Sequence, residues 1–121
     1  GGGSICWFDG HKLQVGPASA GASPGPACYG AGGPLCITDV NLLLGKLDPA
    51  LMGIPIDEAP ARQALLALCQ QVEQATGQPH SAEQVLRGLE RIANEKMADA
   101  IRRISVTKGL DPADYALLSF G

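Results

Sequence analysis

The sequence predicts an α+β fold that is mostly α, with an N-terminal β-hairpin, an ordered loop rich in glycine and proline, three helices and a short C-terminal strand. Three observations support this prediction. β-prone residues flank an Asp-Gly turn within residues 1–16, glycine and proline crowd residues 17–36, and apolar residues recur at helical spacing through most of residues 37–109. The 121 residues, 45% of them hydrophobic, are expected to form one globular domain.

Residues 1–16 are expected to form the hairpin. Ser4–Phe8 is rich in β-prone side chains, and Lys12–Val15 alternates polar with apolar residues. Asp9 and Gly10 lie between the two segments. They favour a tight primed turn, because glycine accepts the positive φ that such a turn requires.

Residues 17–36 carry too much glycine and proline for a regular helix or a central strand. A flexible linker and an ordered loop are the two alternatives. Linkers are rich in Ser, Glu or Lys, whereas this segment contains Ala27, Cys28 and Tyr29, which favour burial. The ordered loop is therefore the preferred interpretation.

The first two helices are expected at about 38–47 and 61–76. Thr38 is a fair N-cap for the first helix, and Pro49 follows its predicted end. The second helix has its apolar residues on one face, and Gly77 is its expected C-cap.

The third helix, about 82–108, has the strongest signal. Ser81 and Gln84 form a capping-box pattern at its start. Its apolar positions are Val85, Leu89, Ile92, Ala93, Met97, Ala100, Ile101 and Ile104. Such a helix is about 40 Å long, which exceeds a domain of this size. A turn and a strand at 115–120 follow, within residues 110–121; a strand buried on both faces needs neighbours, so self-association through unpaired strands is expected.

Composition argues against several classes of function. The net charge of −3 is spread along the chain with no basic face, which argues against nucleic-acid binding. No apolar run approaches the roughly 20 residues of a membrane span, and the first residues do not resemble a signal peptide, so a cytoplasmic location is expected. Four cysteines and two histidines lack metal-ligand spacing, so no metal site is expected.

No complete catalytic constellation is visible in the sequence. Cys28 has two interpretations, a nucleophile exposed by the glycine-rich loop or a buried structural thiol, and the second is favoured because no activating base is adjacent. Asp39 and Asn41 can serve at a site near a helix start or simply cap and solvate that helix. The glycines at both ends adjoin predicted strands, as in turns that bring backbone N–H groups against phosphates.

Several blocks of the sequence, in the same order, resemble the hydantoinase A / 5-oxoprolinase family, which includes the β-subunit of acetone carboxylase. The most specific is Pro-Ala-Cys-Tyr-Gly at residues 26–30, at the end of a Gly/Pro-rich block. The other matching blocks are residues 2–5, 15–25, 32–34, 38–47, 92–106, 109–112 and 115–121. The match is weakest at about 50–84.

This resemblance implies an excised internal fragment of a larger chain with an actin-like ATPase fold. The parent is expected to use ATP, with Mg²⁺ or another divalent ion, to open a cyclic amide, and to work with a hydantoinase B-type subunit or domain. The fragment is expected to bind no cofactor and to be inactive alone, contributing to the nucleotide or substrate cleft; alternatively it is a helical interaction domain that contacts the B-type subunit. The cleft candidates are Gly2, Gly3, Ser4, Cys28, Asp39, Asn41 and Gly121.

Overall fold

A computed structural model describes residues 3–108, with side chains as far as residue 102. The elements in chain order are β1 (Ser4–Phe8), β2 (Leu13–Ser19), the 3-10 turn η1 (Ala27–Tyr29), α1 (Ile37–Leu43), the 3-10 turn η2 (Pro49–Leu51), α2 (Glu58–Thr76) and α3 (Ala82–Lys108). The expected hairpin and the mostly helical character are confirmed. The strand predicted at 115–120 lies outside the described residues.

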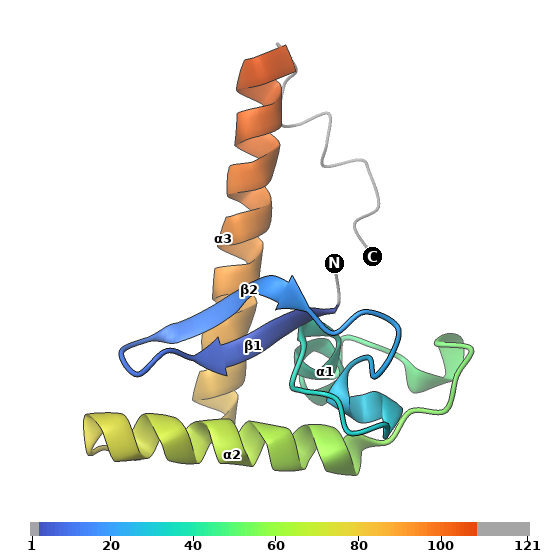
Figure 1. Cartoon of the computed structure of the whole chain (residues 1–121), viewed down its shortest axis with the longest axis vertical. Helices are drawn as coiled ribbons and strands as arrows, with labels where there is room; N and C mark the ends of the chain where they lie inside the picture. Colours follow the sequence, from blue (N-terminus) through green and yellow to red (C-terminus); the bar gives the residue numbers. More distant parts are fainter. Residues whose placement is uncertain (1–2, 109–121) are drawn as a thin grey trace.

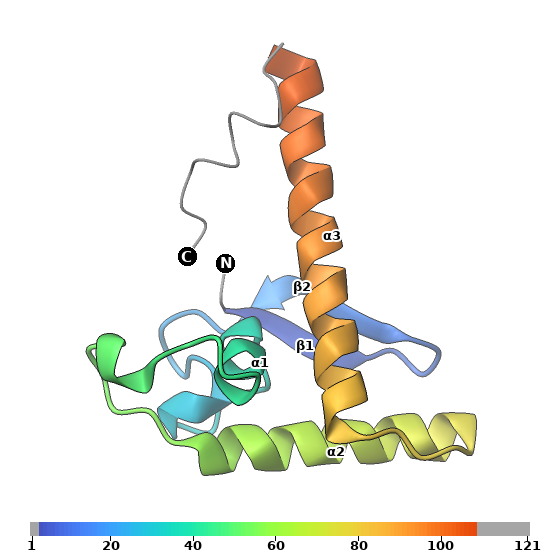
Figure 2. The same cartoon turned by 180° about the vertical axis from the view of Figure 1, so that it is seen from behind.

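The elements meet around one core at the base of the long helix α3 (Figure 1). The hairpin crosses α3, α2 passes beneath the start of α3, and α1 fills the space between the hairpin and α2, as the view from behind also shows (Figure 2). Both strands and the three α-helices contribute to this core. Its buried residues are Cys6, Val15, Leu35, Val40, Leu65, Leu68, Val85, Leu86 and Leu89.

The hairpin is longer than predicted. The strands pair antiparallel with Phe8 opposite Leu13, and the N–H of Asp9 donates to the carbonyl of Lys12 at 3.1 Å, so Gly10, with φ of 99°, lies at the tip of the turn. The Asp9 carboxylate holds this turn by accepting the N–H groups of the second and third residues after it, at 2.7 and 2.8 Å. β2 continues to Ser19 despite Pro17, because proline is tolerated in an edge strand that does not need its N–H.

Helix α1 is shorter than predicted and ends at Leu43 rather than at residue 47. Gly45 takes the left-handed conformation, with φ of 76°. The N–H of Lys46 then donates to the carbonyl of Asn41 at 2.8 Å, and the N–H of Gly45 donates to the carbonyl two residues before the cap at 3.1 Å. This Schellman motif ends the helix before the proline that the sequence suggested as its stop.

Helix α2 begins at Glu58, three residues before the predicted start. Asp57 is its N-cap and accepts the N–H of Ala59 at 3.0 Å. Pro60 is tolerated in the first turn, where backbone N–H groups have no intrahelical partner. The predicted C-cap is confirmed: Gly77 has φ of 72° and its N–H donates within the last turn.

Helix α3 spans the predicted residues, and its capping box is confirmed. The N–H of Gln84 donates to the Ser81 hydroxyl at 3.1 Å, and the N–H of Ser81 donates to the Gln84 side chain at 3.0 Å. Only the first part of the helix packs on the core, while the rest rises above the hairpin (Figure 1). Within residues 3–108, no helix is both long and apolar enough to cross a membrane.

Candidate functional site

The most unusual polar group in the described residues is the carboxylate of Asp39, which is completely buried in α1. Its two oxygens accept three backbone N–H groups. Oδ1 accepts from Cys28 at 2.8 Å, while Oδ2 accepts from Ala27 at 3.0 Å and from Cys36 at 2.8 Å. Burying a carboxylate is costly unless hydrogen bonds replace its water, and three N–H donors meet this requirement.

The local sequence explains why Asp39 reaches these donors. The N-cap of α1 is Cys36 rather than the predicted Thr38, so Asp39 occupies the third helical position. A side chain at that position reaches back to the N–H of the N-cap, as the acidic residue of a capping box does. The same carboxylate then extends past the helix start to η1, which lies against it.

The glycine-rich segment before α1 is folded tightly on itself. The N–H of Ala27 also donates to the carbonyl of Pro34 at 2.9 Å, which closes residues 27–34 into a loop. Gly25 and Gly33 pass so close that a Cβ on Gly33 would overlap the Gly25 carbonyl. These contacts confirm the ordered loop and exclude the flexible linker.

Cys28 is the residue where the loop meets both neighbouring helices. Its N–H is bound by Asp39 of α1, and its carbonyl accepts the N–H of Asp57, the N-cap of α2, at 2.8 Å. Its side chain has no exposed surface and packs with Leu42 and Ala61. The loop therefore fixes the relative position of the two helix starts.

The thiols around Asp39 are held in their neutral form. Burial, then a hydrogen bond with Asp39 and the negative charge of that carboxylate, raise the pKa of Cys28 to about 12. Burial and the same charge raise the pKa of Cys36 to about 11, and burial raises the pKa of Cys6 to about 12. A thiol acts as a nucleophile only as the thiolate, so none of these three is activated in this arrangement. Cys28 is a buried structural thiol, as the sequence favoured.

This arrangement positions backbone and does not itself perform chemistry. The Asp39 oxygens are occupied by N–H donors and closed to solvent, so the carboxylate has no route to a substrate proton or a metal ion. Among residues 3–102, no group of three or more His, Cys, Asp or Glu side chains is placed to hold a metal ion. Towards solvent, the loop exposes the backbone of Gly30 and Gly32, both with positive φ.

A family model described as hydantoinase/oxoprolinase matches residues 1–121, the whole chain. The chain belongs to the hydantoinase/oxoprolinase family. Over its full length it is 44% identical to the caprolactamase subunit alpha of Pseudomonas jessenii and 41% identical to the 5-oxoprolinase PfmaA of Pestalotiopsis fici. It spans only 17% and 10% of these two relatives, respectively.

Two solved structures share this fold. The crystal structure of the ATP-dependent caprolactamase from Pseudomonas jessenii superposes with a TM-score of 0.73 at 43% identity, covering 94% of this chain and 16% of that one. The nucleotide-free structure of acetone carboxylase superposes with a TM-score of 0.74 at 25% identity, with the same two coverages. The hairpin and three helices are thus a unit that the hydantoinase/oxoprolinase family carries inside much longer chains.

In this hydantoinase/oxoprolinase chain, some of the candidate site residues predicted from the sequence lie close together and others lie apart. Cys28 and Asp39 are in direct contact. Ser4 begins β1, whose next residue bridges to Cys36, so β1 enters beside the same helix start. Asn41 uses its carbonyl at the far end of α1 and contributes nothing to the Asp39 cluster among the hydrogen bonds of residues 3–102.

Of the remaining candidates, Gly3 lies within the described residues. The carbonyl of Gly3 accepts the N–H of Ala20 at 2.9 Å, which extends the hairpin pairing. Gly2 and Gly121 lie outside the described residues. Sequence reasoning missed Cys36 and Ala27 as partners of Asp39. Cysteine is not a preferred N-cap, so the motif was hidden, and only the acidic residue three positions later signalled it.

Proposed function

We propose that this chain is part of a longer, cytoplasmic, ATP-dependent hydrolase of cyclic amides, of the hydantoinase or 5-oxoprolinase kind. In that enzyme it helps to build the scaffold of the nucleotide or substrate cleft, and it has no activity alone. Two facts support this: the family model matches the whole chain, and the chain makes up only 10–18% of relatives that include 5-oxoprolinases and a caprolactamase subunit.

The observation that carries the cleft proposal is the loop at residues 25–36. On the buried side of the loop, the Asp39 carboxylate holds the backbone by hydrogen bonds. On the solvent side, Gly30 and Gly32 have no side chains to cover the backbone. A fixed, side-chain-free backbone lets a phosphate or a cyclic amide approach N–H and C=O groups closely. The candidates for lining or supporting the cleft remain Gly2, Gly3, Ser4, Cys28, Asp39, Asn41 and Gly121.

Use of ATP and Mg²⁺ is consistent with the family, but the described residues alone provide no site for the metal ion. Asp39 is saturated by N–H donors, and no cluster of potential metal ligands exists within residues 3–102. We therefore assign the divalent ion and the principal phosphate loops to other parts of the longer chain, and propose that this unit is one part of the actin-like ATPase fold of that chain. ATP would activate the amide there, and this unit would shape one wall.

Isothermal titration calorimetry tests the division of roles. With Mg²⁺ present, ATP is expected to bind the full-length chain that carries this sequence and not residues 1–121 alone. ATP-dependent hydrolysis of 5-oxoproline, hydantoin and caprolactam by the full-length chain then identifies the ring that it opens. Binding of ATP by residues 1–121 alone would refute the proposed dependence on the rest of the enzyme.

A charge placed on the loop tests whether it lines the cleft. Ala31→Glu puts a carboxylate between Gly30 and Gly32 at an exposed position. It is expected to raise the KM for ATP or for the cyclic amide by about tenfold, the effect of about 1.4 kcal/mol from a like charge or a blocked contact. Ala50→Glu is the matched control at an exposed position in η2. Equal kinetics of the two variants would place the loop outside the cleft.

A second candidate role is contact with a hydantoinase B-type subunit. Leu51 in η2 is 83% exposed and Ile54, just after η2, is 42% exposed, so this connector presents apolar surface to solvent. A relative named as a subunit alpha implies a partner for that relative. If the B-type subunit docks here, Leu51→Ser in the full-length chain will weaken co-purification with that subunit, whereas Leu66→Ser, at another exposed leucine, will not.

A further inference from the structure

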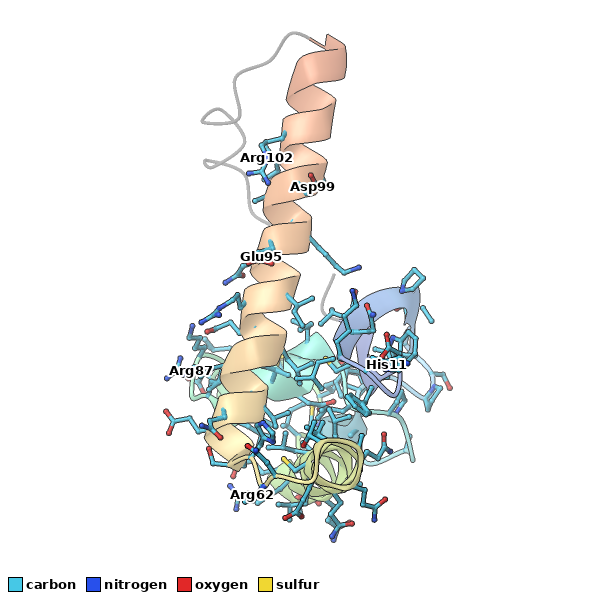
Figure 3. All side chains as sticks on the ribbon, turned by 90° about the vertical axis from the view of Figure 1, so that its left-hand side faces the viewer. His11, Arg62, Arg87, Glu95, Asp99 and Arg102 are labelled. Carbon is cyan, nitrogen blue, oxygen red and sulfur yellow. The ribbon has the colours of Figure 1, made fainter. Side chains whose placement is uncertain are left out.

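The loop at residues 25–36 and the segments on either side of it are almost free of charge. The chain has nine Lys and Arg residues and twelve Asp and Glu residues, yet Asp39 is the only one of these within residues 13–45, and neither histidine lies there. Many of the others lie on the helices: Figure 3 shows Arg62 on α2, and Arg87 and Arg102 along α3. The loop therefore carries no cation of its own to neutralise a phosphate group.

The backbone N–H groups that converge in this region are already occupied by the carboxylate of the protein itself. Asp39 accepts the N–H groups of Ala27 and Cys28 in the loop and of Cys36 at the start of α1, at 3.0, 2.8 and 2.8 Å. Converging backbone N–H groups are the usual means by which a loop holds a phosphate without a charged side chain. Here a buried carboxylate takes that place, so a phosphate has no access to these donors.

The charge of Asp39 also acts against an anion on the outer surface of the loop. None of the ion pairs among residues 3–102 includes Asp39, so the dipoles of its N–H donors are the groups that offset its negative charge. Like charges repel, and the repulsion is stronger near the protein interior than in water. A phosphate group on this loop would lie close to a negative charge and beside no positive one.

The exposed tip of the loop offers hydrogen-bonding groups of both kinds. Among the hydrogen bonds of residues 3–102, none uses the N–H of Ala31 or Gly32 or the carbonyl of Gly30, and all three residues are exposed. An ionised phosphate offers only acceptors to such a tip. The amide of a small ring is held cis, so its N–H and its C=O lie on one edge and match a backbone C=O and N–H together.

We propose that the loop tip, residues 30–32, binds the uncharged amide edge of the cyclic substrate and that the phosphates of ATP lie elsewhere in the cleft. This assignment rests on the proposal that the loop lines the cleft. The lack of cations and the internal carboxylate disfavour a phosphate, and the exposed donors and acceptor at the tip favour a ring with a neutral cis-amide.

Millisecond hydrogen exchange in the full-length chain tests this assignment. The probes are a non-hydrolysable ATP analogue with Mg²⁺, the rings caprolactam, hydantoin and 5-oxoproline, and each ring together with the analogue. The amides of Ala31 and Gly32 are expected to exchange about tenfold more slowly only when a ring is present, while those of η2 do not change. Protection by the analogue alone would overturn the assignment and leave the loop in the cleft. Protection by no probe would refute both proposals.

The sign of an added charge separates a ring from a phosphate. Ala31→Glu and Ala31→Lys are compared in the full-length chain by isothermal titration calorimetry with the same probes. Both variants are expected to weaken ring binding by about tenfold, because either side chain blocks a contact equal to about one hydrogen bond, and to leave binding of the ATP analogue unchanged. Ala50→Lys is the control for the added side chain.

Two outcomes of this comparison count against different proposals. Tighter binding of the ATP analogue to Ala31→Lys, together with weaker binding to Ala31→Glu, would overturn the assignment of the loop tip to the ring. Affinities for ring and analogue that match those of Ala50→Lys in both variants would instead refute the placement of the loop in the cleft.

Discussion

Removing the Asp39 carboxylate is the sharpest test of how the loop is held. In Asp39→Ala, the N–H of Ala27 keeps the carbonyl of Pro34 at 2.9 Å as an acceptor. The N–H groups of Cys28 and Cys36 keep no acceptor among the described hydrogen bonds. A buried donor without a partner costs about 1–3 kcal/mol, so the two together should cost about 2–6 kcal/mol. That is a large share of the 5–15 kcal/mol typical of a folded domain.

The amide variant refines this expectation. Asp39→Asn retains one carbonyl oxygen, so one of the two N–H groups keeps its acceptor while the other faces an NH₂ group. The expected loss is about 1–3 kcal/mol, between the wild type and Asp39→Ala. Asp48→Ala is the control: this exposed carboxylate accepts one N–H, from Ala50 at 3.0 Å, and a cap of this kind contributes about 1 kcal/mol.

Urea unfolding followed by the fluorescence of Trp7, the single tryptophan, measures these free energies. Hydrogen exchange locates the effect, because the amides of Cys28 and Cys36 should lose protection in the Asp39 variants and keep it in Asp48→Ala. The reasoning is refuted if Asp39→Ala unfolds at the same urea concentration as Asp48→Ala and the two amides stay protected.

Four other expectations follow from local geometry. Gly33→Ala should lose about 1–3 kcal/mol in urea unfolding, because its Cβ would overlap a backbone carbonyl. Gly88→Ala should gain up to about 1 kcal/mol in the same assay, since its Cβ finds ordinary contact at 3.6 Å in a helix interior. Burial raises the pKa of Cys6 from 9.0 to about 12, so the unfolded chain releases this proton first. Stability should therefore fall as the pH rises from 9 towards 12, and Cys6→Ala should flatten that decline. The hydrogen bond from the Lys46 ammonium lowers the pKa of Glu90, so Lys46→Ala should raise it in an NMR titration of that carboxyl group.

Local signals in the sequence predicted most of the elements, and tertiary contacts decided the rest. The Ser81 capping box and Gly77 are self-contained signals, and both ends that they predicted are confirmed. The start of α1 was placed wrongly because Thr38 is a better N-cap by type than Cys36. The sequence has no way to show that η1 brings two further N–H donors to Asp39, since those contacts span 11 and 12 residues.

The site was predictable only as a set of residue types. The residue type of Cys28 favours burial, and the absence of an adjacent base argued against a nucleophilic role for its thiol. The direct contact between Cys28 and Asp39 occurs in a loop in which Gly25 and Gly33 cross closely. Glycine permits such a crossing, but its presence does not specify which two segments meet.

The connector between α1 and α2 is anchored at both ends by contacts that do not involve its middle. The Schellman motif at Gly45 closes one end, and the N–H of Asp57, bound by the carbonyl of Cys28, closes the other. Lengthening a tethered surface loop is thermodynamically mild, about 0.6 kcal/mol for each doubling. For folding, the turn between Pro49 and Gly53 is therefore a permissive place for extra residues, where a family member can acquire a new recognition segment or an experimenter a reporter peptide without disturbing the Asp39 cluster.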